Sequence, residues 1–108
     1  MRILICDDDL ELSQQLEKIL ISFFQKNSLK YPEIVIYNNG TDLLQDFQSK
    51  DIVFLDIEMP GMNGIYIGNE LKRQNNEGTV FCFDRDFNDR VIIQSKGVFH
   101  ISKNSLLI

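Results

Sequence analysis

Short apolar runs alternate along this chain with longer stretches in which apolar residues recur at helical spacing. The clearest short run is Ile52–Leu55, which leads into Asp56 and is followed by turn residues. This pattern is typical of a strand that is buried on both faces of a parallel sheet. The predicted strands are Arg2–Cys6, Glu33–Tyr37, Ile52–Leu55, Thr79–Phe83 and Val98–Ser102.

The stretches between these runs are expected to be helices. The strongest helical stripe consists of Leu12, Leu16, Ile19, Leu20, Phe23 and Phe24. Two phenylalanines of this stripe are expected in the core, together with Phe54, Phe81 and Phe83. A second, short helix is expected to begin at a Thr41 cap, with an apolar face made of Leu43, Leu44 and Phe47.

Two weaker helical patterns complete the alternation. A shared face of Gly64, Ile67, Gly68 and Leu71 predicts a helix after the third strand. The stretch Asp86–Lys96 combines helical spacing with a β-branched run, and we predict a helix there because strands and helices alternate elsewhere. Such alternation implies a doubly wound α/β fold of the flavodoxin-like type, with five parallel strands in the order 2-1-3-4-5.

Composition limits the classes of function that this chain could have. With 108 residues, of which 44% are hydrophobic and 25% charged, it is expected to form one globular domain over residues 1–108. A net charge of −5 without a basic stripe argues against direct nucleic-acid binding. No apolar run could span a membrane and no secretory signal is visible, so a cytoplasmic protein is expected. Cys6 and Cys82 lie in apolar runs and are expected to be buried thiols.

The predicted strand order brings acidic residues together. The run Asp7–Asp9 follows the first strand and Asp56 ends the third, and these strands are neighbours in the predicted sheet. Carboxylates this close repel one another unless a small hard cation such as Mg²⁺ is bound. An Asp beside such an ion is suited to attack phosphorus, and Lys103 after the fifth strand is the candidate positive charge opposite it.

Three motifs together resemble the receiver domain of two-component response regulators. They are ICDDD at the end of the first strand, FLDIEMPGMNG at the third strand, and a lysine after the fifth. The wording IEMPGMNG is similar to the branch with LytTR-type output domains. The resemblance, which runs from Met1 to about Lys103, implies that Asp56 accepts a phosphoryl group, that Asp8 binds Mg²⁺ and that Asp7 binds it through water.

The same resemblance implies further roles and a partner. Glu58 would offer its backbone carbonyl to the metal, Lys103 would pair with the phosphoryl group, and a sensor histidine kinase would be the phosphoryl donor. A receiver of this kind is expected to accept a phosphoryl group and not to be a turnover enzyme.

The second half of the chain departs from the receiver pattern. The fourth strand ends in Cys82–Arg85 without the usual Ser or Thr, Asn104 replaces the proline that usually follows the lysine, and His100 stands at the switch aromatic position. The sequence also ends before a last helix could form. We therefore expect a second copy or another protein to cover the face that this helix would occupy.

Other interpretations of these residues remain open. Asp8 and Glu11 have the spacing of a capping box, and Asp56 could be a turn residue before Met59–Gly61. A degenerate receiver could act as an interaction module independent of phosphorylation. A haloacid-dehalogenase-like phosphatase, with Asp7 and Asp9 as its acidic pair, is the remote alternative.

Overall fold

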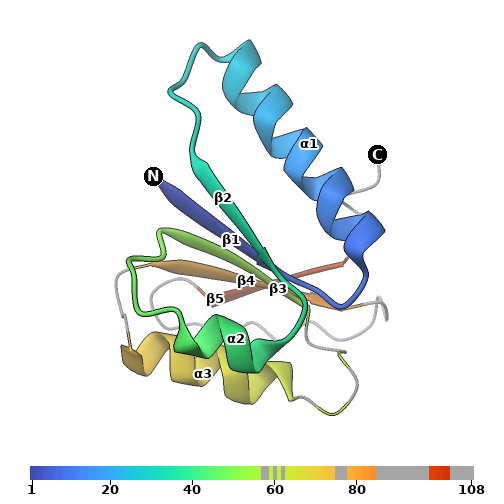
Figure 1. Cartoon of the computed structure of the whole chain (residues 1–108), viewed down its shortest axis with the longest axis vertical. Helices are drawn as coiled ribbons and strands as arrows, with labels where there is room; N and C mark the ends of the chain where they lie inside the picture. The colour runs from blue at the N-terminus through green and yellow to red at the C-terminus, as the bar shows by residue number, and fades with distance from the viewer. Residues whose placement is uncertain (57–58, 60, 62, 75–77, 85–97, 103–108) are drawn as a thin grey trace.

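The structure is a computed structural model that describes residues 1–56, 59, 61, 63–74, 78–84 and 98–102. The elements are β1 (Arg2–Cys6), α1 (Leu10–Lys26), β2 (Glu33–Tyr37), α2 (Gly40–Gln45), β3 (Ile52–Asp56), α3 (Gly64–Gln74), β4 (Thr79–Asp84) and β5 (Val98–Ser102). From β1 to β4 strands and helices alternate as predicted (Figure 1).

The strands form one parallel sheet in the order β2-β1-β3-β4-β5. The predicted order β2-β1-β3-β4 is thereby confirmed, and β5 pairs with β4 from Val98 to Ser102. Helix α1 covers one face of the sheet, whereas α2 and α3 cover the other (Figure 1). This three-layer arrangement leaves the carboxyl ends of β1 and β3 side by side at one edge.

The central strands supply two hydrophobic cores, because successive residues of a strand point to opposite faces. Strand β1 contributes Ile3 and Ile5 to the core under α1, and Leu4 and Cys6 to the core under α2 and α3. All four side chains are buried. Burial on both faces explains why the β1 and β3 sequences are almost wholly apolar.

Helix α1 begins one residue later than a capping box at Asp8 would require. Asp9 is the N-cap residue, and its carboxylate accepts the N–H of Leu12 at 3.1 Å. The predicted core position of Phe23 is wrong, since this residue is 55% exposed, whereas Phe24 is buried. Neighbouring residues of a helix point about 100° apart, so both phenylalanines cannot face the sheet.

Helix α2 differs from its prediction at both ends. Asn39, and not Thr41, is the N-cap residue, and its side chain accepts the N–H of Asp42 at 2.8 Å. The helix ends at Gln45, so Phe47 lies beyond it and is 81% exposed. The physical reason for the early end is that the next residue, Asp46, is held by contacts with the sheet.

Helix α3 confirms the predicted apolar face, because Gly64, Ile67, Gly68 and Leu71 are all buried. The helix predicted over 86–96, and the prediction of a missing last helix, fall outside the described residues. None of the described helices is both long and apolar enough to cross a membrane.

Candidate metal centre

Three carboxylates meet at the carboxyl ends of β1 and β3. Asp7 and Asp8 follow β1, and Asp56 is the last residue of β3. Because the two strands are parallel with Cys6 opposite Leu55, the residues that follow these two also lie opposite each other. One carboxylate oxygen from each of Asp7, Asp8 and Asp56 lies within 4.8 Å of the others. The structure therefore brings together the acidic residues that the topology predicted.

The three acids differ in burial. Asp56 is 1% exposed and Asp7 is 6% exposed, whereas Asp8 is exposed to solvent. Two backbone groups orient Asp7. The N–H of Asp9 donates to Asp7 Oδ1 at 2.9 Å, and the N–H of Asp7 donates to the carbonyl oxygen of Tyr37 at 3.0 Å. The position of Asp7 is therefore set by a neighbour in β2 and by the N-cap residue of α1.

The donor set fits a small divalent cation with oxygen ligands. Mg²⁺ is bound by carboxylates and waters at about 2.1 Å, so opposite ligands lie about 4.2 Å apart. The oxygens of Asp7, Asp8 and Asp56 are within 4.8 Å of one another, which is close to that spacing. A bound cation would also offset the repulsion among three neighbouring negative charges.

Comparison with known families explains the arrangement. Residues 3–97 of the chain match the response regulator receiver domain. The chain belongs to this family. Domains of the family work in two-component systems and typically accept a phosphoryl group instead of acting as turnover enzymes. The matched residues include all three acids of the candidate metal centre.

The receiver is similar to several known proteins. It is 28% identical over 113 residues to the transcriptional regulatory protein CpxR homolog of Haemophilus influenzae, over 85% of this chain and 47% of that protein. The chain thus spans about half the length of this curated relative.

Solved structures show the same fold. The response regulator TrrA of Thermotoga maritima, in complex with Mg²⁺-BeF, matches with a TM-score of 0.65 and 24% identity, over 94% of this chain and 86% of that one. TrrA has also been crystallised with the histidine kinase ThkA. A CheY-like receiver of Methanospirillum hungatei JF-1 gives a TM-score of 0.71 at 16% identity, over 98% and 86% of the two chains.

Membership of the receiver family decides between some of the functions that the sequence left open. It excludes the haloacid-dehalogenase-like alternative, and Asp9, which that alternative needs in the reaction, caps α1 instead. Glu58 and Lys103 lie outside the described residues, so their roles stay predictions. Arg85 and Asn104, two of the departures from the receiver pattern, also lie outside the described residues.

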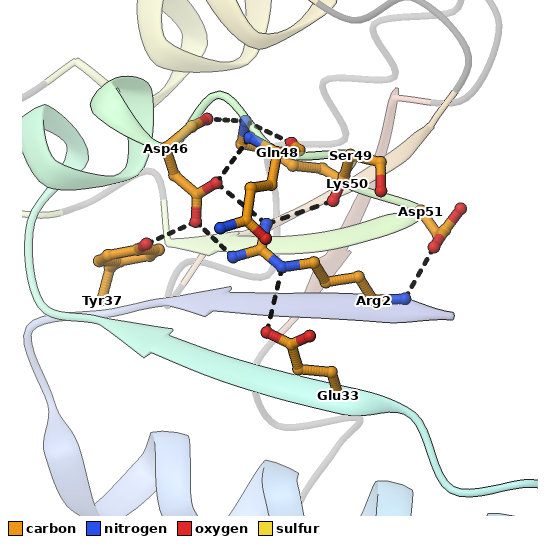
Figure 2. A network of polar contacts seen from close by, with 8 residues as sticks. All are labelled: Arg2, Glu33, Tyr37, Asp46, Gln48, Ser49, Lys50 and Asp51. Carbon is orange, nitrogen blue, oxygen red and sulfur yellow. Dashed lines mark hydrogen bonds and ion pairs between the residues drawn. The ribbon is translucent and has the colours of Figure 1, made fainter.

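A second cluster of polar side chains, which the sequence did not reveal, lies on the α2 side of the receiver's sheet (Figure 2). The guanidinium of Arg2 donates to both carboxylate oxygens of Asp46, at 3.0 and 2.6 Å. The hydroxyl of Tyr37 donates to Asp46 Oδ2 at 2.5 Å, and Lys50 Nζ donates to the Asp46 carbonyl oxygen. We call Arg2, Tyr37, Asp46 and Lys50 the Asp46 network.

The charges of the Asp46 network shift one another's titration. Hydrogen bonding from Arg2 holds the pKa of Asp46 well below its usual range, and Asp46 in turn raises the pKa of Arg2. The hydrogen bond to Asp46 raises the pKa of Tyr37, whereas burial lowers the pKa of Lys50. The one signal in the sequence was Arg2, a charge in an apolar strand, because such a charge needs a buried partner.

The two cysteines are buried and free, as predicted. Burial, together with the nearby charges of Asp7 and Asp56, raises the pKa of the Cys6 thiol to about 12. Burial also raises the pKa of the Cys82 thiol to about 11. Both side chains therefore act as small apolar residues of the core at neutral pH.

Proposed function

We propose that this receiver takes a phosphoryl group onto Asp56 while Asp7, Asp8 and Asp56 bind Mg²⁺. The supporting observation is the meeting of these three carboxylates within 4.8 Å, with Asp56 the most buried of them. In this proposal Asp8 binds the metal directly and Asp7 binds it through water. Glu58 offers its backbone carbonyl, and Lys103 pairs with the phosphoryl group.

The proposed reaction uses the carboxylate of Asp56 as a nucleophile. One of its oxygens forms a bond to phosphorus as the bond between phosphorus and the donor breaks, and the donor leaves with that electron pair. Bound Mg²⁺ would neutralise charge on the transferring oxygens. The N–H of Asp9 holds the Asp7 carboxylate in place beforehand.

A sensor histidine kinase is the proposed phosphoryl donor. Family membership supports this donor, as does the crystallisation of the structurally similar TrrA with a histidine kinase. The role would place the chain in the cytoplasm. The name of the CpxR homolog supports a link to transcription. The acidic net charge supports a role in which this segment itself does not contact nucleic acid. A LytTR-type output stays a prediction from the sequence.

Acetyl phosphate labelling tests the proposal. Incubation of the chain with acetyl phosphate and Mg²⁺ should add one phosphoryl group, stable in acid and labile in base, as detected by intact-mass spectrometry. Asp56→Asn should abolish the adduct. Asp9→Asn is the matched control, because Asn caps a helix as well as Asp does and labelling should persist. An unlabelled native chain, or a fully labelled Asp56→Asn variant, would overturn the proposal.

One observation favours a second function, a receiver that binds its partner without regard to phosphorylation. Strand β4 ends in Cys82–Asp84, and this segment lacks the Ser or Thr that the family resemblance calls for. The partner would then be another protein or a second copy. Amide exchange over β4 and β5 separates the two functions, since unchanged rates in the phosphorylated chain favour the interaction module. In both proposals, residues 1–108 form a single domain.

A further inference from the structure

The Asp46 network meets the metal centre at Tyr37. Tyr37 is the last residue of β2, and of the described strands only β1 pairs with β2. The Tyr37 carbonyl oxygen accepts the N–H of Asp7 at 3.0 Å, while its hydroxyl donates to Asp46 at 2.5 Å. One residue thus connects the backbone of a proposed metal ligand to a nearly buried ion pair.

The position of Tyr37 in the sheet makes an anchor necessary. The end of an edge strand opens more readily than a central strand, because it has a neighbour on one side only and its ladder of hydrogen bonds stops there. The bond from Asp7 lies at this end, one residue beyond the last pair of β1 and β2, Cys6 and Tyr37. Whatever holds the Tyr37 backbone therefore also holds Asp7.

Asp46, which accepts the hydrogen bond of the Tyr37 hydroxyl, is itself held in place by several contacts. The Asp46 side chain is 5% exposed, and both of its oxygens accept hydrogen bonds from Arg2. Lys50 holds the backbone of the same residue through its carbonyl oxygen. Hydrogen bonds to an ionised acceptor are roughly twice as strong as neutral ones. Figure 2 shows the Tyr37 ring reaching from β2 to this carboxylate.

We propose that Tyr37 is a positioning residue for the metal centre. Its hydroxyl, clamped by Asp46, fixes the carbonyl that holds Asp7, and so keeps the Asp7 carboxylate in place to bind a divalent cation. This inference rests on the proposed function, because it takes Asp7 as part of the metal site. Tyr37 acts through the backbone of Asp7, and the bond from the Asp9 N–H fixes the carboxylate itself.

Tyr37→Phe tests this inference because it removes only the hydroxyl and keeps the ring that packs against the core under α2 and α3. We expect the affinity for Mg²⁺, titrated as MgCl₂ and followed by the amide NMR signals of Asp7–Asp9, to fall by about threefold to tenfold. Loss of a side-chain partner of a metal ligand typically costs about 10–100-fold, and a contact through the backbone should cost less. Solvent exchange of the Asp7 amide should quicken by a similar factor, while that of Val53 in β3 stays unchanged.

Two variants control for other effects. Tyr66→Phe removes an exposed hydroxyl on α3, and Phe24→Leu weakens the core on the opposite face of the sheet. Neither should change the Mg²⁺ affinity or the exchange of the Asp7 amide. An unchanged Asp7 amide in Tyr37→Phe would overturn the inference, as would an equal loss of affinity in Phe24→Leu. If the native chain bound no Mg²⁺, the proposed function would fail. Exchange of the Asp7 amide would still decide whether the Tyr37–Asp46 hydrogen bond stabilises the bond from Asp7 to the Tyr37 carbonyl.

Discussion

Two arginine–carboxylate pairs in this receiver differ in their surroundings. The side chains of Arg2 and Asp46 are 10% and 5% exposed, whereas Arg73, which pairs with Glu70 on α3, is 76% exposed. An exposed pair contributes about 0–1 kcal/mol, because water and salt screen it. Removal of one partner from a buried pair costs about 3–5 kcal/mol, because the other charge is left without compensation.

This difference predicts unequal effects of the same chemical change. Asp46→Asn should lower the free energy of unfolding by about 3 kcal/mol, at the lower end of this range because Arg2 keeps its ion pair with the exposed Glu33 at 3.3 Å. Urea denaturation followed by circular dichroism measures this loss. Glu70→Gln, the matched control, should lower it by less than about 0.5 kcal/mol. Losses of similar size in the two variants would show that the Arg2 charge can be buried without the Asp46 carboxylate.

The lowered pKa of Asp46 also fixes the sign of a pH effect. The pKa of Asp in an unfolded chain is about 3.9, and the hydrogen bonds from Arg2 keep the folded Asp46 carboxylate charged to lower pH. The contribution of Asp46 to stability is therefore fully present above about pH 5 and is lost as the pH falls through about 3.9 towards the folded pKa. The stability difference between the native chain and Asp46→Asn should shrink along this acid range. A difference that does not vary with pH would contradict the assignment.

At the scale of single elements, the strands were predicted well and the helix ends were not. Burial on both faces leaves an unbroken apolar run, which marks β1 and β3 in the sequence itself. A helix start is harder, because several Asp, Asn and Thr residues offer capping groups. The choice depends on where the strand ends. Asp7 still bonds to Tyr37 in β2, and Asp9 itself has an extended backbone (φ −90°, ψ 98°), so α1 can begin only after Asp9, which is its cap.

The caps of α2 provide a direct comparison. Asn39→Ala should destabilise the protein by about 1 kcal/mol, because the N–H of Asp42 loses its acceptor. Thr41→Ala should change stability by less than about 0.5 kcal/mol, since Thr41 is an exposed residue within the helix and Ala is a good helix former. Urea denaturation of both variants measures the difference, and a larger loss in Thr41→Ala would restore the original prediction.

At the scale of the whole molecule, the meeting of Asp7, Asp8 and Asp56 followed from strand order alone, because parallel neighbours end at the same edge. The Asp46 network could not be predicted in this way. Arg2 and Asp46 are 44 positions apart, and their contact depends on α2 ending at Gln45. Strand patterns give the course of the sheet, whereas such contacts depend on where a connecting loop turns back over it.

Metal binding should stabilise the receiver as a whole, because the three acids come together only in the folded chain. At a Mg²⁺ concentration 100 times the Kd, linkage predicts a gain of about 2.7 kcal/mol in the free energy of unfolding. Thermal unfolding with MgCl₂, compared with NaCl at equal ionic strength, measures this gain. Asp7→Asn should remove most of it, whereas Glu11→Gln, an exposed acid on α1, should retain it. Equal melting curves in the two salts would contradict the metal site.

Side chains along β1 point alternately to the two faces of the sheet, which makes the length of this strand as important as its composition. Ile3 and Ile5 enter one core, Leu4 and Cys6 enter the other, and Asp7 follows at the acidic edge. A substitution alters one of these positions, but insertion or deletion of a single residue would send every later side chain to the opposite face. Changes of side chain in β1 should therefore be tolerated more readily than changes of length, and the number of residues from Ile3 to Asp7 is itself a requirement of the site.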